Sequence, residues 1–114
     1  MKDFGEFLPL SPAVLHILLA LAGDKLHGYG IMQEIARQSE GRYKVGPGTL
    51  YDNLQKLMDQ GMVEEVERPA KEDPRRRYYR LTGLGRGLLT AEVQRLDGVV
   101  RDAKLHLGLK PRRA

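Results

Sequence analysis

Residues 46–58 read GPGTLYDNLQKLM, and this stretch decides the fold that the sequence predicts. Pro47 suits the first turn of a helix, because its fixed φ is helical and it has no N–H to leave unpaired. Apolar side chains then recur at helical spacing: Leu50, Leu54, Leu57 and Met58. Gly61 is a typical residue at a helix end. The sequence therefore predicts an amphipathic helix that starts at Pro47 and ends before Gly61.

The rest of this helix surface carries groups that can hydrogen-bond to phosphates and base edges. The residues predicted there to bind DNA are Gly48, Thr49, Tyr51, Asp52, Asn53 and Lys56. Hydroxyl groups near a helix N-terminus suit phosphate, so Thr49 and Tyr51 are the preferred backbone contacts. The alternative for Tyr51 is packing against the segment that follows. Asn53 and Lys56 suit base edges or phosphate, with plain solvation as the alternative.

Two further helices are predicted ahead of this one. Ser11 and Pro12 form an N-cap and first helical position, and an apolar stripe continues to about Ala22. Residues 27–30 read HGYG, a flexible entry to a second helix whose inner face includes Ile31 and Ile35. Residues 38–45 form a polar turn. The second short helix, this turn and the helix with exposed polar N-terminal residues make a helix-turn-helix arrangement.

A β-hairpin is predicted directly after the DNA-facing helix. Residues 62–67 and 76–81 suit strands, and the segment between them contains two prolines. Such a hairpin is a wing, and it is expected to place Arg75, Arg76 and Arg77 near the phosphate backbone or the adjacent minor groove. Because strand side chains alternate, at most two of the three should face DNA together. At least one of the two tyrosines at 78 and 79 is expected to be core.

A last helix is predicted over residues 83–107, with Thr82 as its cap. At 1.5 Å per residue it would be roughly 37 Å long, more than a small winged helix can cover. Its apolar stripe is therefore expected to pair with a second copy of the chain. The predicted dimerisation residues are Leu88, Leu89, Val93, Leu96, Val99, Val100, Ala103 and Leu107. The expected division is a winged helix-turn-helix domain at 1–82 with an arm at 1–10, a dimerisation helix at 83–109 and a basic tail at 110–114.

Charge is unevenly distributed along the 114 residues. Residues 68–80 contain six Lys or Arg against two Asp or Glu, and residues 110–114 add three more cations. A local basic patch suggests a polyanion partner, although a solvated loop and tail is the plainer explanation. The apolar run 13–22 is too short to span a bilayer. A cytoplasmic protein that joins the nucleoid when bound to DNA fits these features.

Catalytic and metal chemistry find no support in the sequence. There is no cysteine, and His16, His27 and His106 lack the spacing of metal ligands. No nucleophile–base arrangement or phosphate-binding glycine loop is present. We therefore expect neither a cofactor nor an enzyme.

Taken in order, these motifs resemble the PadR-like winged-helix transcriptional regulators, in their short form with one C-terminal helix. The matching segments span about residues 8–107: His27 to Ile31, Pro47 to Tyr51 with Leu54 and Leu57, Gly61 to Val63, and Arg76 to Thr82 with Gly85. The resemblance implies a mainly α fold with a small hairpin, a homodimer, and repression at a pseudo-palindromic operator. It also implies release by a small aromatic effector.

Two departures from the family pattern matter. Asp52 puts a negative charge on the presumed DNA face, where it either accepts from a cytosine amine or repels phosphate. Tryptophan is absent, so a planar ligand cannot be stacked on an interface Trp. Two other functions stay open: a winged-helix adaptor whose basic wing meets an acidic protein, and a ligand-binding scaffold with weak DNA affinity.

Overall fold

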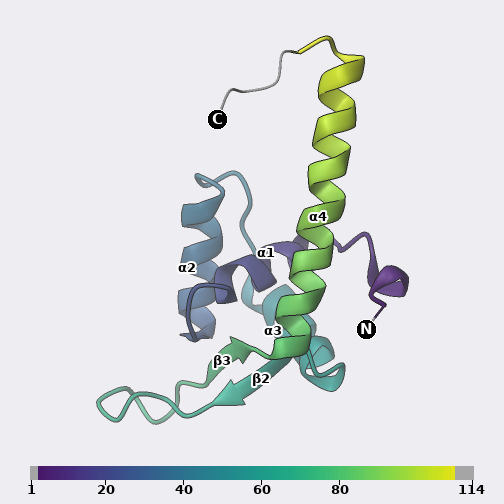
Figure 1. Cartoon of the computed structure of the whole chain (residues 1–114). Coiled ribbons are helices and arrows are strands. Elements are labelled where there is room, and N and C mark those ends of the chain that lie inside the picture. The colour runs from purple at the N-terminus through teal and green to yellow at the C-terminus, as the bar shows by residue number, and fades with distance from the viewer. Residues whose placement is uncertain (1–2, 110–114) are drawn as a thin grey trace.

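Three helices pack around one another and a fourth, much longer helix rises from them (Figure 1). The structure is a computed structural model, and it describes residues 3–109. Its elements are η1 (Gly5–Phe7), α1 (Pro12–Leu21), β1 (Leu26–His27), α2 (Gly28–Gln38), α3 (Pro47–Asp59), β2 (Val63–Val66), β3 (Tyr78–Leu81) and α4 (Gly83–His106). The predicted mainly α fold with a small hairpin and a long last helix is confirmed.

The helix ends follow the local chemistry of the sequence. Ser11 caps α1, with its Oγ accepting a hydrogen bond from the backbone N–H of Val14 at 3.2 Å. Thr82 caps α4 in the same way, accepting from the N–H of Gly85 at 3.0 Å. Beyond α3, Gly61 has a φ of 76°, a left-handed conformation that glycine adopts without a Cβ penalty.

The sheet has one strand more than the sequence predicted. Its order is β1-β3-β2, with both pairs antiparallel. Residues 27–30 were expected to be a flexible entry to α2, but Leu26 and His27 pair with Tyr79 and Tyr78. This prediction was wrong because β3 offers a free edge, and a two-residue strand has too little sequence to show a period of its own. The hairpin strands are also shorter than predicted.

The core lies where α1 crosses α2, α3 and the base of α4. Ile17, Leu18 and Leu21 of α1 are fully buried, as are Ile31 and Ile35 of α2. The predicted stripe of α3 adds Leu50, Leu54 and Leu57. Both tyrosines of β3 are buried, so the expectation that at least one is core is confirmed and extended to both. These contacts fix α3 by its apolar face and leave its other faces for partners.

The first turns of α4 belong to this core. Leu88 and Leu89 are 1% and 6% exposed within the single chain, so they cannot supply side-chain area to a second copy. Their assignment to dimerisation was wrong, because the helix lies on α1 here and its stripe is covered intramolecularly. Gly85 allows a second close approach, between α4 and the turn that joins α3 to β2: a Cβ there would lie 1.9 Å from the carbonyl oxygen of Met62.

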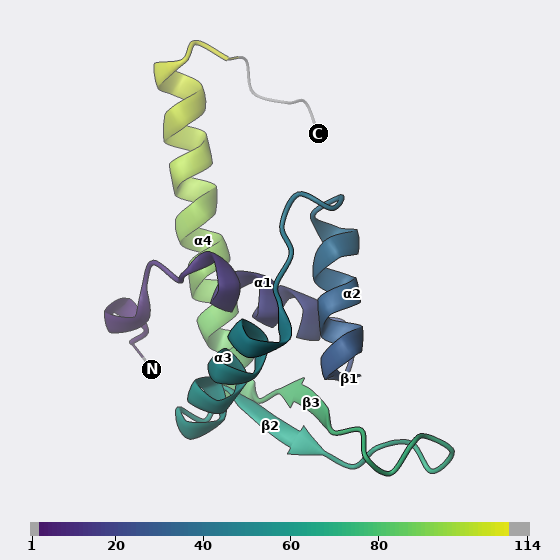
Figure 2. The same cartoon turned by 180° about the vertical axis from the view of Figure 1, so that it is seen from behind.

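The N-terminal arm is tied to α4 as well. Glu92 is buried, and its Oε2 accepts a hydrogen bond from the backbone N–H of Leu10 at 2.8 Å. Arg95 pairs with the same carboxylate, which holds the pKa of Glu92 below its ordinary value. Beyond this point α4 leaves the body of the protein, as the view from behind shows (Figure 2).

Candidate nucleic-acid interface

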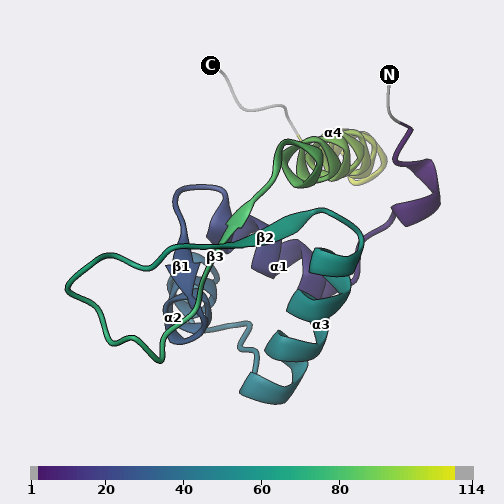
Figure 3. The ribbon, with the colours of Figure 1, turned by 90° about the horizontal axis from the view of Figure 1, so that it is seen from below.

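Three segments that are far apart in sequence line one groove. They are the start of α2, the first turns of α3, and the end of the loop between β2 and β3, which reach the same side of the molecule (Figure 3). The groove is lined by His27, Gly28, Tyr29, Tyr51, Arg75, Arg76, Arg77 and Tyr79. It thus joins α3 to the arginines predicted to bind DNA.

The outward face of α3 carries polar and small residues. Gly48, Thr49 and Asp52 are all exposed there, as predicted for a surface that meets a partner. Gln55, which lies one turn beyond Asp52, is also exposed, and its amide donates to Asp59 at 3.0 Å. Helical spacing places Gln55 on this face, although the predicted set of DNA-binding residues omitted it.

Tyr51 lies on the flank of α3 that faces α2. Its hydroxyl oxygen sits above Gly28, where an added Cβ would come within 2.1 Å of it. The ring therefore packs on the start of α2, rather than only on the hairpin as the alternative had it, and it stays 48% exposed. Nearby, burial raises the pKa of Tyr79, and the proximity of Tyr51 adds to this shift. The phenol of Tyr51 thus forms part of the groove lining.

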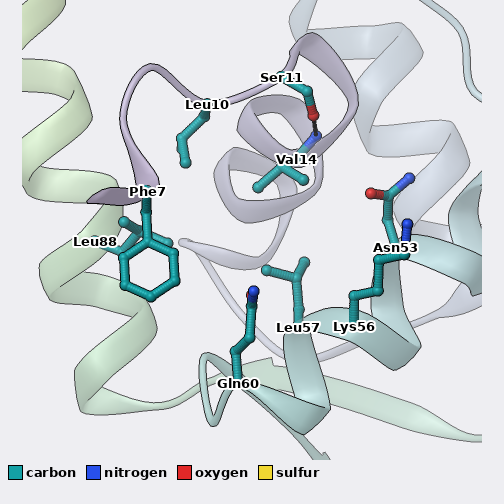
Figure 4. Close-up of a pocket in the computed structure, with 9 residues that line it drawn as sticks. All are labelled: Phe7, Leu10, Ser11, Val14, Asn53, Lys56, Leu57, Gln60 and Leu88. Carbon is teal, nitrogen blue, oxygen red and sulfur yellow. Dashed lines mark hydrogen bonds between the residues drawn. The ribbon is translucent and has the colours of Figure 1, made fainter. Parts of the chain in front are cut away.

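The opposite flank of α3 faces the N-terminal arm. Asn53 and Lys56 lie there, and Asn53 donates its amide N–H to the carbonyl of Thr49 at 2.8 Å. This bond uses one of the two amide N–H groups, so the second N–H stays available to a phosphate or base and Oδ1 to a base donor. Lys56 is exposed at the rim of the flank (Figure 4).

The arginines of the hairpin loop are exposed but paired. Arg75 binds Asp73 at 2.9 Å, and Arg76 binds Glu72 at 3.1 Å. The side-chain hydrogen bond from Arg75 keeps the pKa of Asp73 below its ordinary value. Arg77 and Arg80 also face carboxylates, so four of the six cations in residues 68–80 are in ion pairs, which charge counting along the sequence could not show.

The start of α2 is a part of the groove that the predicted DNA-binding set missed. Tyr29 is 60% exposed in the first turn of α2. Among the described residues, the N-cap residue His27 makes no side-chain cap hydrogen bond, so the first N–H groups of α2 have no such partner. The motif HGYG contained the signal: a glycine at a close approach, followed by a hydroxyl at a helix start.

The outer half of α4 presents the remaining predicted dimerisation residues. Val93, Val99, Val100, Ala103 and Leu107 are exposed, and Leu96 is partly buried. Five of these six alternate at steps of three and four residues, the spacing of a coiled-coil seam. The structure thus separates this stripe from Leu88 and Leu89. The basic tail, residues 110–114, lies outside the described residues.

A membrane-spanning helix and a metal site each require features that the described part of the chain does not show. Within residues 3–109 no helix is both long and apolar enough to cross a membrane. Over the same residues no three potential metal ligands of the His, Cys, Asp or Glu type come together.

A protein-family model and a curated relative indicate the family of this chain. Residues 14–91 match the transcriptional regulator PadR-like family. The transcriptional regulator Rv3488 of Mycobacterium tuberculosis is 36% identical over 88 residues, which cover 77% of this chain and 78% of that protein.

Two solved structures show the same fold. A PadR-like regulator from Bacillus cereus has a TM-score of 0.71 at 20% identity, over 85% of this chain and 92% of its own. Bacillus subtilis PadR, solved in complex with operator DNA, has a TM-score of 0.65 at 23% identity, over 81% of this chain and 49% of its own. The family is one of regulators rather than enzymes. The chain belongs to the PadR-like family of transcriptional regulators.

Proposed function

We propose that the protein binds duplex DNA, with α3 in the major groove and the β2–β3 loop on the neighbouring backbone. The observation that carries this proposal is the continuous groove formed by the start of α2, α3 and three arginines. A helix fits the major groove, while arginines and helix N-termini suit phosphate. The relative from Bacillus subtilis was solved with operator DNA, which supports this use of the shared fold.

The proposal includes a homodimer built through the outer half of α4. Val93, Val100 and Leu107 leave apolar area in solvent that a second α4 would bury. Two-fold symmetry then presents two copies of α3, so the operator is an inverted repeat with half-sites about one helical turn apart, or a small multiple of it. Repression follows if the dimer occupies a promoter. Under this proposal, the winged helix-turn-helix domain of residues 1–82 reads DNA, and within the predicted dimerisation helix of residues 83–109 only the outer half joins the copies.

Release by a small aromatic effector is the third part of the proposal. A cavity of about 160 Å³ lies between the arm, the start of α1, α3 and α4 (Figure 4). Phe7, Leu10, Val14, Leu57 and Leu88 give it apolar walls, and Gln60 points into it. An enclosed apolar cavity of about 150 Å³ holds benzene, and this pocket, which is partly open to solvent and has polar residues at its edge, has a volume that suits a single ring. Lys56 lines this cavity and also belongs to the predicted DNA-binding residues of α3. This position supports an effect of effector binding on DNA binding.

Selection of preferred duplexes from a random library, repeated at two salt concentrations, tests the DNA proposal. We expect an inverted repeat and an affinity that falls steeply with salt. Arg76→Ala should weaken binding to the selected operator and flatten its salt slope by about one unit. The matched control is Arg37→Ala, which removes another exposed, paired arginine from the far end of α2 and should change neither quantity.

The selection can also contradict the proposal. One contradicting result is that no consensus is recovered at either salt concentration while an acidic protein binds the chain. If Arg76→Ala abolishes binding of that protein, the adaptor function replaces DNA recognition. If tight binding of a single-ring compound accompanies weak, sequence-independent DNA binding, the ligand scaffold is the better description.

A further inference from the structure

The loop between β2 and β3 supplies counterions for its own arginines. Arg75 binds Asp73 through two hydrogen bonds, from Nε to Oδ1 at 3.2 Å and from Nη2 to Oδ2 at 2.9 Å. Arg76 binds Oε2 of Glu72 at 3.1 Å. All four side chains lie at the surface or near it, so these pairs are accessible to a DNA phosphate.

The loop backbone holds the pairs in place. Asp73 Oδ1 also accepts from the backbone N–H of Arg75 at 2.9 Å, and the carbonyl of Asp73 accepts from the N–H of Arg76 at 3.0 Å. The N–H of Glu72 donates in turn to the carbonyl of Pro69 at 2.9 Å. These turns place each carboxylate beside its arginine, so the pairing does not rely on side chains that meet at random.

Farther along the hairpin, Arg77 lies 3.9 Å from Glu65 and Arg80 lies 2.9 Å from Glu64. Residues 63–81 contain six Lys or Arg against five Asp or Glu, so the hairpin is almost neutral. An arginine that meets a phosphate normally gains affinity by releasing condensed ions from DNA. An arginine that already holds a carboxylate gains less, and the carboxylate beside the phosphate is repelled.

We propose that Glu72 and Asp73 are specificity-determining residues, which lower the affinity of the hairpin for DNA of unrelated sequence. This inference rests on the proposed DNA-binding function. On unrelated DNA, electrostatic attraction to phosphates supplies essentially all of the binding free energy. No base contact then holds the loop against the DNA backbone. The ion pairs then stay closed. On the operator, base contacts from α3 fix the loop against the backbone, so the arginines exchange carboxylate for phosphate.

Asp73→Asn and Glu72→Gln test this inference in the full-length chain. Binding is measured by fluorescence anisotropy on the selected operator duplex and on a scrambled duplex of equal length, over a series of salt concentrations. Affinity for the scrambled duplex should rise roughly 2- to 5-fold per substitution, and its salt slope should steepen by about 0.9. Affinity for the operator should rise less, so the ratio between the two duplexes falls.

Two controls separate a local effect from a change in net charge. Glu34→Gln removes the same charge from another exposed arginine pair, Glu34–Arg37, in α2. Its effect on both duplexes should be smaller than that of Asp73→Asn. In the double variant Asp73→Asn with Arg75→Ala, the gain on the scrambled duplex should disappear, because the freed arginine is the group that makes the new contact.

The outcomes distinguish this inference from the function on which it rests. If the wild-type chain selects no operator, the proposed DNA recognition fails. If it selects an operator but Asp73→Asn and Glu72→Gln behave like Glu34→Gln, the carboxylates do not set specificity. A gain that persists in the double variant, or an equal gain on both duplexes, also overturns the inference.

Discussion

The two halves of α4 share one apolar period but lie in opposite environments. In the first half, Leu88 is 1% exposed and packs in the core around α1. In the second half, Val100 is 49% exposed and the helix leaves the body of the protein (Figures 1 and 2). The difference shows that an apolar helical stripe indicates which side chains are to be buried. It does not indicate whether the same chain or a second chain buries them.

Polar residues mark the change between the halves. Glu92 is buried where the N-terminal arm crosses α4. Its carboxylate accepts hydrogen bonds from the backbone N–H of Leu10 and from the guanidinium of Arg95. One position later, Val93 is exposed. Arg86 adds a link from the first half to the body, donating to the carbonyl of Ala22 at 3.1 Å. The first half is thus fixed by the single chain, and the second is available to a partner.

The largest loss of stability is expected for Leu88→Ala in the first half. It removes a fully buried side chain at a site where the surrounding helices limit collapse, so the free energy of unfolding should fall by about 2–5 kcal/mol. Urea unfolding at fixed protein concentration measures this change. Leu105→Ala is the control, since that leucine is 73% exposed, and it should leave the urea midpoint nearly unchanged. Equal losses for the two variants would remove the distinction between the halves.

A smaller loss of stability is expected when a methyl group is added at the close contact at the base of α4. Gly85→Ala places a methyl group against the backbone carbonyl of Met62, so the helix must shift, at a cost of about 1–3 kcal/mol. The matched control is Gly98→Ala in the outer half, where an added Cβ meets nothing described within 4 Å. That substitution should stabilise the helix, because alanine is the better helix former. Thermal melting of both variants separates the two predictions.

The third effect depends on pH. Arg95 holds the pKa of Glu92 below 4.5, so the charged carboxylate stabilises the fold above pH 4.5, and this stabilisation is lost as the pH falls through the lowered value. Glu92→Gln should therefore melt below the wild type at pH 7, and the gap should narrow as the pH falls below about 4.5. A gap that stays constant with pH would show that burial and shape, rather than charge, account for the role of Glu92.

The smallest change in single-chain stability is expected for Val100→Asp, because this side chain lies in the exposed half. Its effect should fall on association: the monomer–dimer dissociation constant should rise at least about 10-fold when a charge enters the seam. Sedimentation analysis measures this change, and circular dichroism checks that the helices persist. If wild type and variant sediment alike, the outer half of α4 is not the dimer contact.

Much of the fold was predictable because local chemistry and helical period agreed. Ser11, Pro47 and Thr82 mark helix starts, and each helix begins at or next to the residue so marked. The missed strand β1 has two residues and exists only because β3 pairs with it. Leu88 and Leu89 were assigned to the wrong partner for a related reason: periodicity carries no information about long-range contacts.

The candidate site divides in the same way. The sequence by itself determined that α3 is amphipathic, that its start carries glycines and hydroxyls, and that arginines follow in the hairpin, since these depend on residue type and spacing alone. The tertiary structure decided that Tyr51 lies over Gly28, that Tyr29 joins the groove, and that Arg75 and Arg76 face Asp73 and Glu72. Such contacts depend on how helices and turns are placed in space, and no local period encodes that placement.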